Sequence, residues 1–166
     1  MQEPARRRLF TALVVLVLLQ TGAHIAQSFV NYPAWGAIGG GFAEYHRQVA
    51  VLAGLFLFLP RVIELLFTFV VIRYRAAEVP LWTLVVGLAL AAAAIASTAL
   101  VQRPLHLQLE ALGNAPELLS RLRSTDLVRH LLGAARAIIY VGVLFNLVAS
   151  TAAPQDSPPR RLRDAT

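Results

Sequence analysis

The sequence predicts an all-α membrane protein, folded as an antiparallel bundle of four transmembrane helices, and three observations lead to this class. Hydrophobic residues make up 57% of the 166 residues and charged residues only 14%, which is unusual for a soluble domain. The apolar residues lie in long blocks, and most charges lie between them. A span needs about 20 apolar residues. The predicted spans are residues 9–30, 49–72, 81–101 and 127–149.

The first predicted span follows the basic cluster Arg6 to Arg8. This beginning also fits a secretory signal, with Thr21-Gly22-Ala23 as its cleavage site. The apolar run continues beyond that site to Val30, however, and we therefore expect a retained helix that is long enough to span. The third span begins after Pro80, a residue suited to the first turn of a helix.

The connections between the spans differ in character. Residues 74–79 form a short basic turn between the second and third spans, whereas residues 31–48 form a longer connection with aromatic residues and glycines. The connection 102–126 is predicted to hold a short amphipathic helix, because leucines recur among polar residues. We expect residues 1–151 to form the transmembrane domain and residues 152–166 a disordered basic cytoplasmic tail.

All fifteen basic residues are arginines, and their distribution predicts the orientation. Clusters precede the first span, follow the second span and occupy the C-terminal tail, which places them on one side of a chain that crosses four times. The positive-inside rule then predicts a multi-pass protein of the bacterial inner membrane with both termini in the cytoplasm. The expected partner is the lipid bilayer, not nucleic acid. A homo-oligomer or another membrane subunit also stays open as a partner.

Polar residues inside the spans fall on single helical faces. Four-residue and three-residue spacings align them on the first helix, and the same rule aligns pairs on the second and fourth helices. A helical rise of about 1.5 Å per residue brings them to similar depths. We expect one outward-opening cavity with a ligand site, and His106 and Tyr45-His46 near its mouth. The predicted site residues within the spans are Gln20, His24, Gln27, Arg61, Glu64, Arg136 and Tyr140.

The charges in this set predict the chemistry of a ligand. A single charge at the centre of a span costs about 2.5 to 3.5 kcal/mol, so each needs a partner or a function. Glu64 cannot neutralise both Arg61 and Arg136, and Arg136 is expected to be the unmatched arginine. An anionic or electron-rich ligand would supply the missing partner, as a carboxylate, phenolate, quinone oxygen or lipid headgroup does. Alternatively, Arg61 and Glu64 serve only to hold the helix register.

Other site chemistries find less support in the sequence. The chain has no cysteine, which excludes disulfides and thiolate ligands, and no metal site is predicted. No cofactor is predicted; a haem held between His24 and His106 or His130, or a bound quinone, remains an alternative. Gly39 to Gly41 lacks the lysine of a phosphate-binding loop. A structural or partner-binding subunit without catalysis and a small-solute transporter also remain open.

The stretch 97–109 and the Asn31-Tyr32-Pro33 segment resemble those of a family of uncharacterised four-helix bacterial membrane proteins. More distantly, the chain is similar to the anthrone-oxygenase-like group of small membrane proteins, which has a comparable proline segment before its last helix and an arginine inside that helix. The resemblance implies the four-helix fold and a metal-free oxidation of a phenolic substrate. In such a scheme His24 or His106 would act as catalytic general base, and Arg61 and Arg136 would stabilise the anion.

Overall fold

The computed structural model describes residues 1–152, and in this range it contains helices and no strand. Four long helices are each long and apolar enough to cross a membrane, by length and composition. Of the predicted tail, residues 152–166, the part after Ala152 lies outside the described residues. The long helices comprise α1 (Glu3–Ala26), η1 (Gln27–Asn31) and α2 (Tyr32–Trp35); α3 (Phe42–Ala53), η2 (Gly54–Phe58) and α4 (Leu59–Arg73); α5 (Leu81–Ser97), η3 (Thr98–Gln102) and α6 (Arg103–Leu112); and α7 (Pro116–Ala152).

Each of the first three long helices contains one wide, π-helical turn, labelled η1, η2 and η3, and a proline follows two residues after it. Proline has no backbone N–H and its ring crowds the carbonyl four residues before it, which normally breaks a helix. Here the residue before each proline donates its N–H to the carbonyl five residues back. The helices therefore continue through Pro33, Pro60 and Pro104 instead of ending there.

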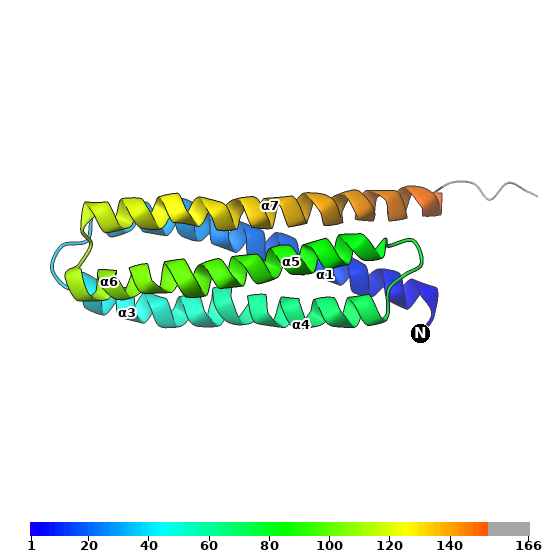
Figure 1. Ribbon diagram of the computed structural model, residues 1–166, viewed down its shortest axis with the longest axis horizontal. Helices are drawn as coiled ribbons and strands as arrows, with labels where there is room; N and C mark the ends of the chain where they lie inside the picture. Colours follow the sequence, from blue (N-terminus) through cyan, green and yellow to red (C-terminus); the bar gives the residue numbers. More distant parts are fainter. Residues whose placement is uncertain (153–166) are drawn as a thin grey trace, which may run out of the picture.

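The four long helices lie side by side as a ring, in which α1 and α5 each contact α4 and α7 (Figure 1). We call the end formed by residues 1–8 and 74–80 the turn end. There the backbone N–H of Ala77 donates to Oε1 of Glu3 at 3.0 Å, which ties the turn to the start of α1. The opposite end, formed by residues 36–41 and 113–115, is the loop end.

One side chain joins the two connections of the loop end. The side-chain amide of Asn114 donates to the backbone oxygens of Trp35 at 2.8 Å and Ile38 at 2.7 Å. Gly113, just before it, has φ +81°, a left-handed conformation that favours glycine and that ends α6. The two connections are therefore fixed to each other at the loop end.

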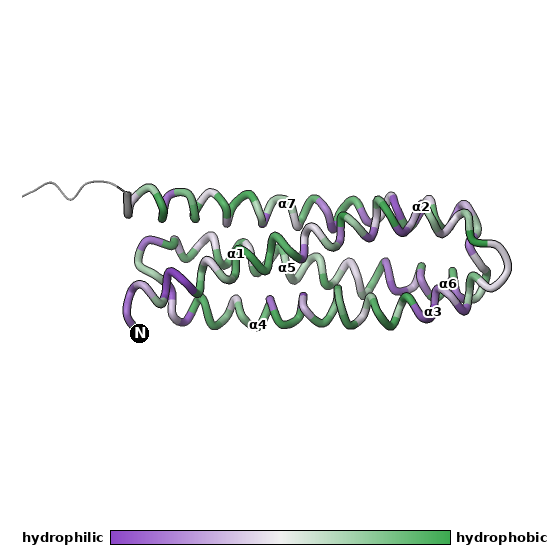
Figure 2. The backbone as a smooth tube through the Cα atoms, turned by 180° about the vertical axis from the view of Figure 1, so that it is seen from behind, coloured by the Kyte–Doolittle hydropathy of each residue, from purple (hydrophilic) through white to green (hydrophobic). Residues whose placement is uncertain are grey.

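Two apolar clusters are buried, one toward each end of the bundle. The cluster toward the turn end contains Phe10, Leu13 and Tyr140, and the cluster at the loop end contains Trp35 and Leu122. Figure 2 shows hydrophobic residues along the middle of the long helices and hydrophilic residues near the N-terminus and around α3 and α6. Large apolar side chains are also exposed outside the bundle, among them Leu19, Phe29, Phe56, Leu100 and Ile138. A surface of this kind is typical of contact with lipid.

The helices extend further than the predicted spans. The first connection shortens to residues 36–41, because α2 and α3 occupy most of the expected loop. The helix predicted in the second connection is present as α6, but it continues α5 through η3 and does not form a separate element over the bundle. The wide turn before Pro104 explains why the helix continues past this proline. The short basic turn between α4 and α5 is present as predicted.

Candidate functional site

A cavity of about 440 Å³ lies in the half of the bundle toward the loop end. All three π-helical turns contribute to its wall: Gln27 from η1, Gly54 from η2 and Thr98 from η3 are examples. Wide turns of this kind occur frequently at functional sites because they displace backbone and side chains from the regular helical pattern. The polar and aromatic residues of the wall are His24, Gln27, Tyr32, Trp35, His46, Phe58, Arg61, Thr98, Gln102, Arg103, His106, Glu110 and Arg129.

The structure divides the predicted site residues between two places. His24, Gln27, Arg61 and His106 line the cavity. The others are not part of its wall: Gln20, Glu64, Arg136 and Tyr140. These four are buried in the bundle, and the last three form a cluster near its centre with Thr68.

Glu64 is the centre of this buried cluster, and it bonds to both arginines. Its side chain is 0% exposed; Oε1 accepts a hydrogen bond from Nη1 of Arg136, and Oε2 lies 3.3 Å from Nη1 of Arg61. Arg136 also donates to Oγ1 of Thr68 at 3.1 Å and lies over the ring of Tyr140 at 5.2 Å. The expectation that Arg136 is the unmatched arginine was wrong. Sequence spacing revealed the pair on α4, but it could not show that α7 brings Arg136 against the same carboxylate.

Arg61 is the arginine that links the buried cluster to the cavity. It shares Glu64 with Arg136, and only its Nη1 donates to a protein oxygen within residues 1–152. The guanidinium carries five N–H donors, of which those on Nε and Nη2 have no acceptor among the described residues. Arg61 can therefore donate to a molecule in the cavity while it keeps its bond to Glu64.

A second arginine of the wall, Arg129, is held by several protein groups. It is paired with Asp126 and donates to Oγ1 of Thr98 at 3.2 Å and to the hydroxyl of Tyr32 at 3.4 Å. Asp126 also accepts a hydrogen bond from Ser28. This network joins α7 to η3 and to the end of the first long helix. Arg129 thus contributes positive charge to the cavity, but most of its donors are already used.

Two histidines and a glutamate lie in a row in the part of the cavity nearest the loop end. Nε2 of His46 on α3 lies 2.9 Å from Nδ1 of His106 on α6, and Nδ1 of His46 lies 3.3 Å from Oε1 of Glu110. His106 and Glu110 are four residues apart and thus share one face of α6. His46 is 0% exposed. The sequence placed both histidines near the mouth of a cavity but did not show that they pair, since the two lie on different helices.

The indole ring of Trp35 packs against both histidines. Its centroid lies 5.0 Å from that of His46 and 5.9 Å from that of His106, with near-perpendicular planes. Tyr32 contacts Trp35 and lies 6.2 Å from His106. The histidine rings are therefore fixed by aromatic packing as well as by hydrogen bonding.

No group of three or more His, Asp or Glu side chains within the described residues could hold a metal ion. Arginines around the cavity would also repel a cation. Comparison with protein-family models, with curated proteins and with solved structures gives no match. The chemistry of the site must therefore be argued from its own residues.

Proposed function

We propose that this chain is a multi-pass membrane protein whose cavity binds a small, largely apolar molecule that carries an anionic or electron-rich oxygen, such as a phenol, a carboxylate or a quinone. The observation that carries the proposal is the position of Arg61, at the inner part of an otherwise mostly apolar cavity and with donors that no described residue uses. A quinone would be a ligand here, held by its oxygens.

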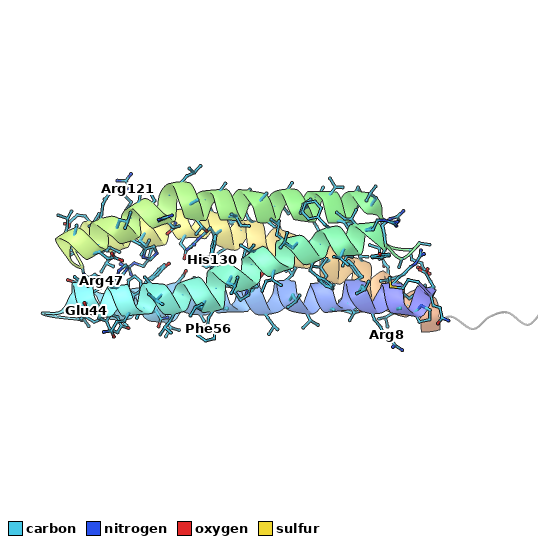
Figure 3. The ribbon with its side chains drawn as sticks, turned by 90° about the horizontal axis from the view of Figure 1, so that it is seen from below. Arg8, Glu44, Arg47, Phe56, Arg121 and His130 are labelled. Atoms are coloured by element: carbon cyan, nitrogen blue, oxygen red, sulfur yellow. The ribbon has the colours of Figure 1, made fainter. Side chains whose placement is uncertain are left out.

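The distribution of exposed residues supports a membrane location. Exposed apolar side chains follow the first long helix to Val30, and about 20 residues suffice to cross the hydrocarbon. More arginines lie at the turn end, where Figure 3 labels Arg8, than toward the loop end, where it labels Arg47 and Arg121. The turn end carries Arg6, Arg7, Arg8, Arg73 and Arg75, and the loop end carries Arg47, Arg103, Arg121 and Arg123. The loop end also carries acidic residues such as Glu44. The positive-inside rule then favours an antiparallel bundle in the bacterial inner membrane, with the turn end in the cytoplasm and the cavity open to the outer face.

The charge balance around the cavity favours an anionic ligand. Three arginines and one glutamate belong to the wall. Glu64, Asp126 and Arg136 lie directly behind it. The wall and the residues directly behind it thus contain four arginines and three carboxylates, a net charge of +1. A ligand with one negative charge would neutralise this excess. A charge-assisted hydrogen bond in a site with little water contributes about 1.5 to 3 kcal/mol.

The rest of the wall favours an apolar ligand body. Leu57, Phe58, Ala94 and Ile95 contribute aliphatic and aromatic surface, and Trp35 adds the largest ring. A volume of about 440 Å³ lies within the range of ligand pockets, about 300 to 1,000 Å³. One or two aromatic rings with a polar oxygen match this shape and composition.

The test uses the two tryptophans of the chain. Trp35 lines the cavity, whereas Trp82 lies on the turn side of α5 and is 62% exposed. In the Trp82→Phe protein, purified in detergent, fluorescence reports on the cavity alone. We expect 4-nitrophenol to quench it saturably and the isosteric 4-nitrotoluene to quench it far less. Arg61→Met should weaken the binding of 4-nitrophenol about tenfold or more, the effect of one charge-assisted hydrogen bond.

The control is Arg47→Met, because Arg47 is exposed, pairs with Glu44 and lies outside the cavity wall. It should leave quenching unchanged. If 4-nitrophenol, benzoate and a short-chain ubiquinone analogue all quench Trp35 no more than 4-nitrotoluene does, the proposal is refuted.

A further inference from the structure

The His46–His106 contact has a defined direction. Nδ1 of His46 is buried and makes no hydrogen bond to a described residue, but the carboxylate of Glu110 lies next to it, with Oε1 at 3.3 Å, an ion-pair distance. An ionised carboxylate carries negative charge and no proton, so at this distance it favours the tautomer of His46 with its hydrogen on Nδ1. Nε2 of His46 is then an acceptor, and the 2.9 Å contact requires that Nδ1 of His106 donates to it.

This order leaves the other nitrogen of His106, Nε2, with an unprotonated lone pair, on a ring that lines the cavity. The arrangement resembles a catalytic triad, in which a carboxylate orients a second group and that group acts on a third. Here Glu110 corresponds to the carboxylate, His46 to the second group, and His106, the base, to the third. His24 differs in this respect. It also lines the cavity, but it hydrogen-bonds no side chain among the described residues, so nothing selects its tautomer.

We propose that Glu110, His46 and His106 together form a base that takes the proton from the hydroxyl group of a weakly acidic ligand in this cavity. The inference rests on the proposed function and narrows its ligand class to phenols and enols, which carry both a removable proton and an oxygen that Arg61 can stabilise. His106 is the residue that touches the ligand. His46 and Glu110 are positioning residues that act through it.

The proton step balances within these groups and requires no oxidant. The ligand's O–H bond breaks and an N–H bond forms at Nε2 of His106, while the Nδ1 proton of His106 moves to Nε2 of His46. The products are the ligand anion, a neutral His106 and an imidazolium at His46 beside the Glu110 carboxylate. The second ring thus places the positive charge next to a carboxylate that is 27% exposed and open to solvent.

Other charged and titratable groups also face the histidine pair and bear on its pH response. They are Arg103 on α6, Arg129 on α7 and Tyr32 on α2, in addition to Glu110. Both arginines oppose a positive charge on the rings and favour the ligand anion. The carboxylate of Glu110 is therefore the group that allows the proton to stay on the pair.

The experiment measures the absorption of 4-nitrophenol bound to the full-length Trp82→Phe protein as pH is varied, because the phenol and the phenolate have separate bands. We expect the bound probe to be half-ionised at a lower pH than in the Glu110→Gln and His106→Gln variants, by about one pH unit or more, a tenfold change in ionisation. Glu110→Asp should restore part of the shift. The control Glu44→Gln changes an exposed carboxylate at the same end, and it should have no effect.

Quenching of Trp35 fluorescence in the same samples shows whether the base proposal alone fails or whether the binding proposal fails as well. A probe that binds but stays protonated, or that ionises equally in wild type and in both variants, overturns the base and leaves the binding proposal intact. Absence of saturable quenching by 4-nitrophenol, benzoate and the ubiquinone analogue overturns the proposed function and the base together. Because Glu110 is partly exposed, its variants should fold even if substitutions at buried His46 do not.

Discussion

The two arginines that share Glu64 should contribute unequally to stability, Arg136 more than Arg61. Arg136 is 1% exposed and lies near the middle of α7, about 30 Å from its start at a rise of about 1.5 Å per residue. Replacing Arg136 by Met removes the principal partner of Glu64, which is fully buried. Breaking a buried pair in this way costs about 3 to 5 kcal/mol, and an isolated charge at the centre of a span costs about 3 kcal/mol. We therefore expect about 3 kcal/mol of destabilisation.

Arg61→Met should cost less, about 1 kcal/mol, because Glu64 keeps its bond to Arg136 and loses only a contact of 3.3 Å. Unfolding in mixed micelles with increasing denaturing detergent would measure both variants. The triple variant Arg61→Met, Glu64→Leu and Arg136→Met should recover most of the loss, because removing all members of a buried charge group leaves no unpaired charge and is often close to neutral. An Arg61→Met protein that is as unstable as Arg136→Met would refute this division of roles.

Three further predictions concern the fold. Gly87→Ala should destabilise the bundle by about 1 to 3 kcal/mol in the same unfolding assay, because an added Cβ would collide with the ring and hydroxyl of Tyr140; a neutral effect would contradict this packing. Asn114→Ala should increase hydrogen exchange in both loop-end connections, since two backbone oxygens lose their donor; unchanged exchange would contradict the bridge. Arg7 holds the pKa of Glu78 below its usual range, so the contact stabilises the fold at neutral pH and its contribution is lost as the pH falls through that lowered pKa; Glu78→Gln should remove this acid sensitivity, and identical pH profiles for wild type and variant would count against it.

The sequence predicted the helices better than it predicted the site, and the reason is physical. An apolar run long enough to span a membrane leaves the backbone no alternative to a helix, so the four long helices follow from local composition alone. Pro33, Pro60 and Pro104 lie inside or beside these runs, and the sequence did not show that each is accommodated by a π-helical turn. A π-helical turn before a proline depends on packing against neighbouring helices, which keeps the helix continuous.

Contacts between side chains on one helix were predicted, and contacts between helices were not. The pairing of Arg61 with Glu64 follows from their spacing. The bond from Arg136 to the same carboxylate and the pairing of His46 with His106 depend on the rotation of one helix against another. A single sequence does not specify that rotation, and for this reason the predicted cavity was divided in the structure into a buried charge cluster and an open cavity.

The central claim is that a phenolic ligand enters the cavity beside Arg61, and photolabelling of the membrane-embedded protein tests it most directly. Irradiation with 4-azidophenol, followed by mass spectrometry of the peptides, should place adducts within residues 24–61 and 94–110, which contribute most of the cavity wall. Excess 4-nitrophenol should suppress these adducts, and phenyl azide without the hydroxyl should label them less. Labelling confined to positions exposed on the outside of the bundle, such as Ile138 and Phe145, and unchanged by 4-nitrophenol would contradict the account.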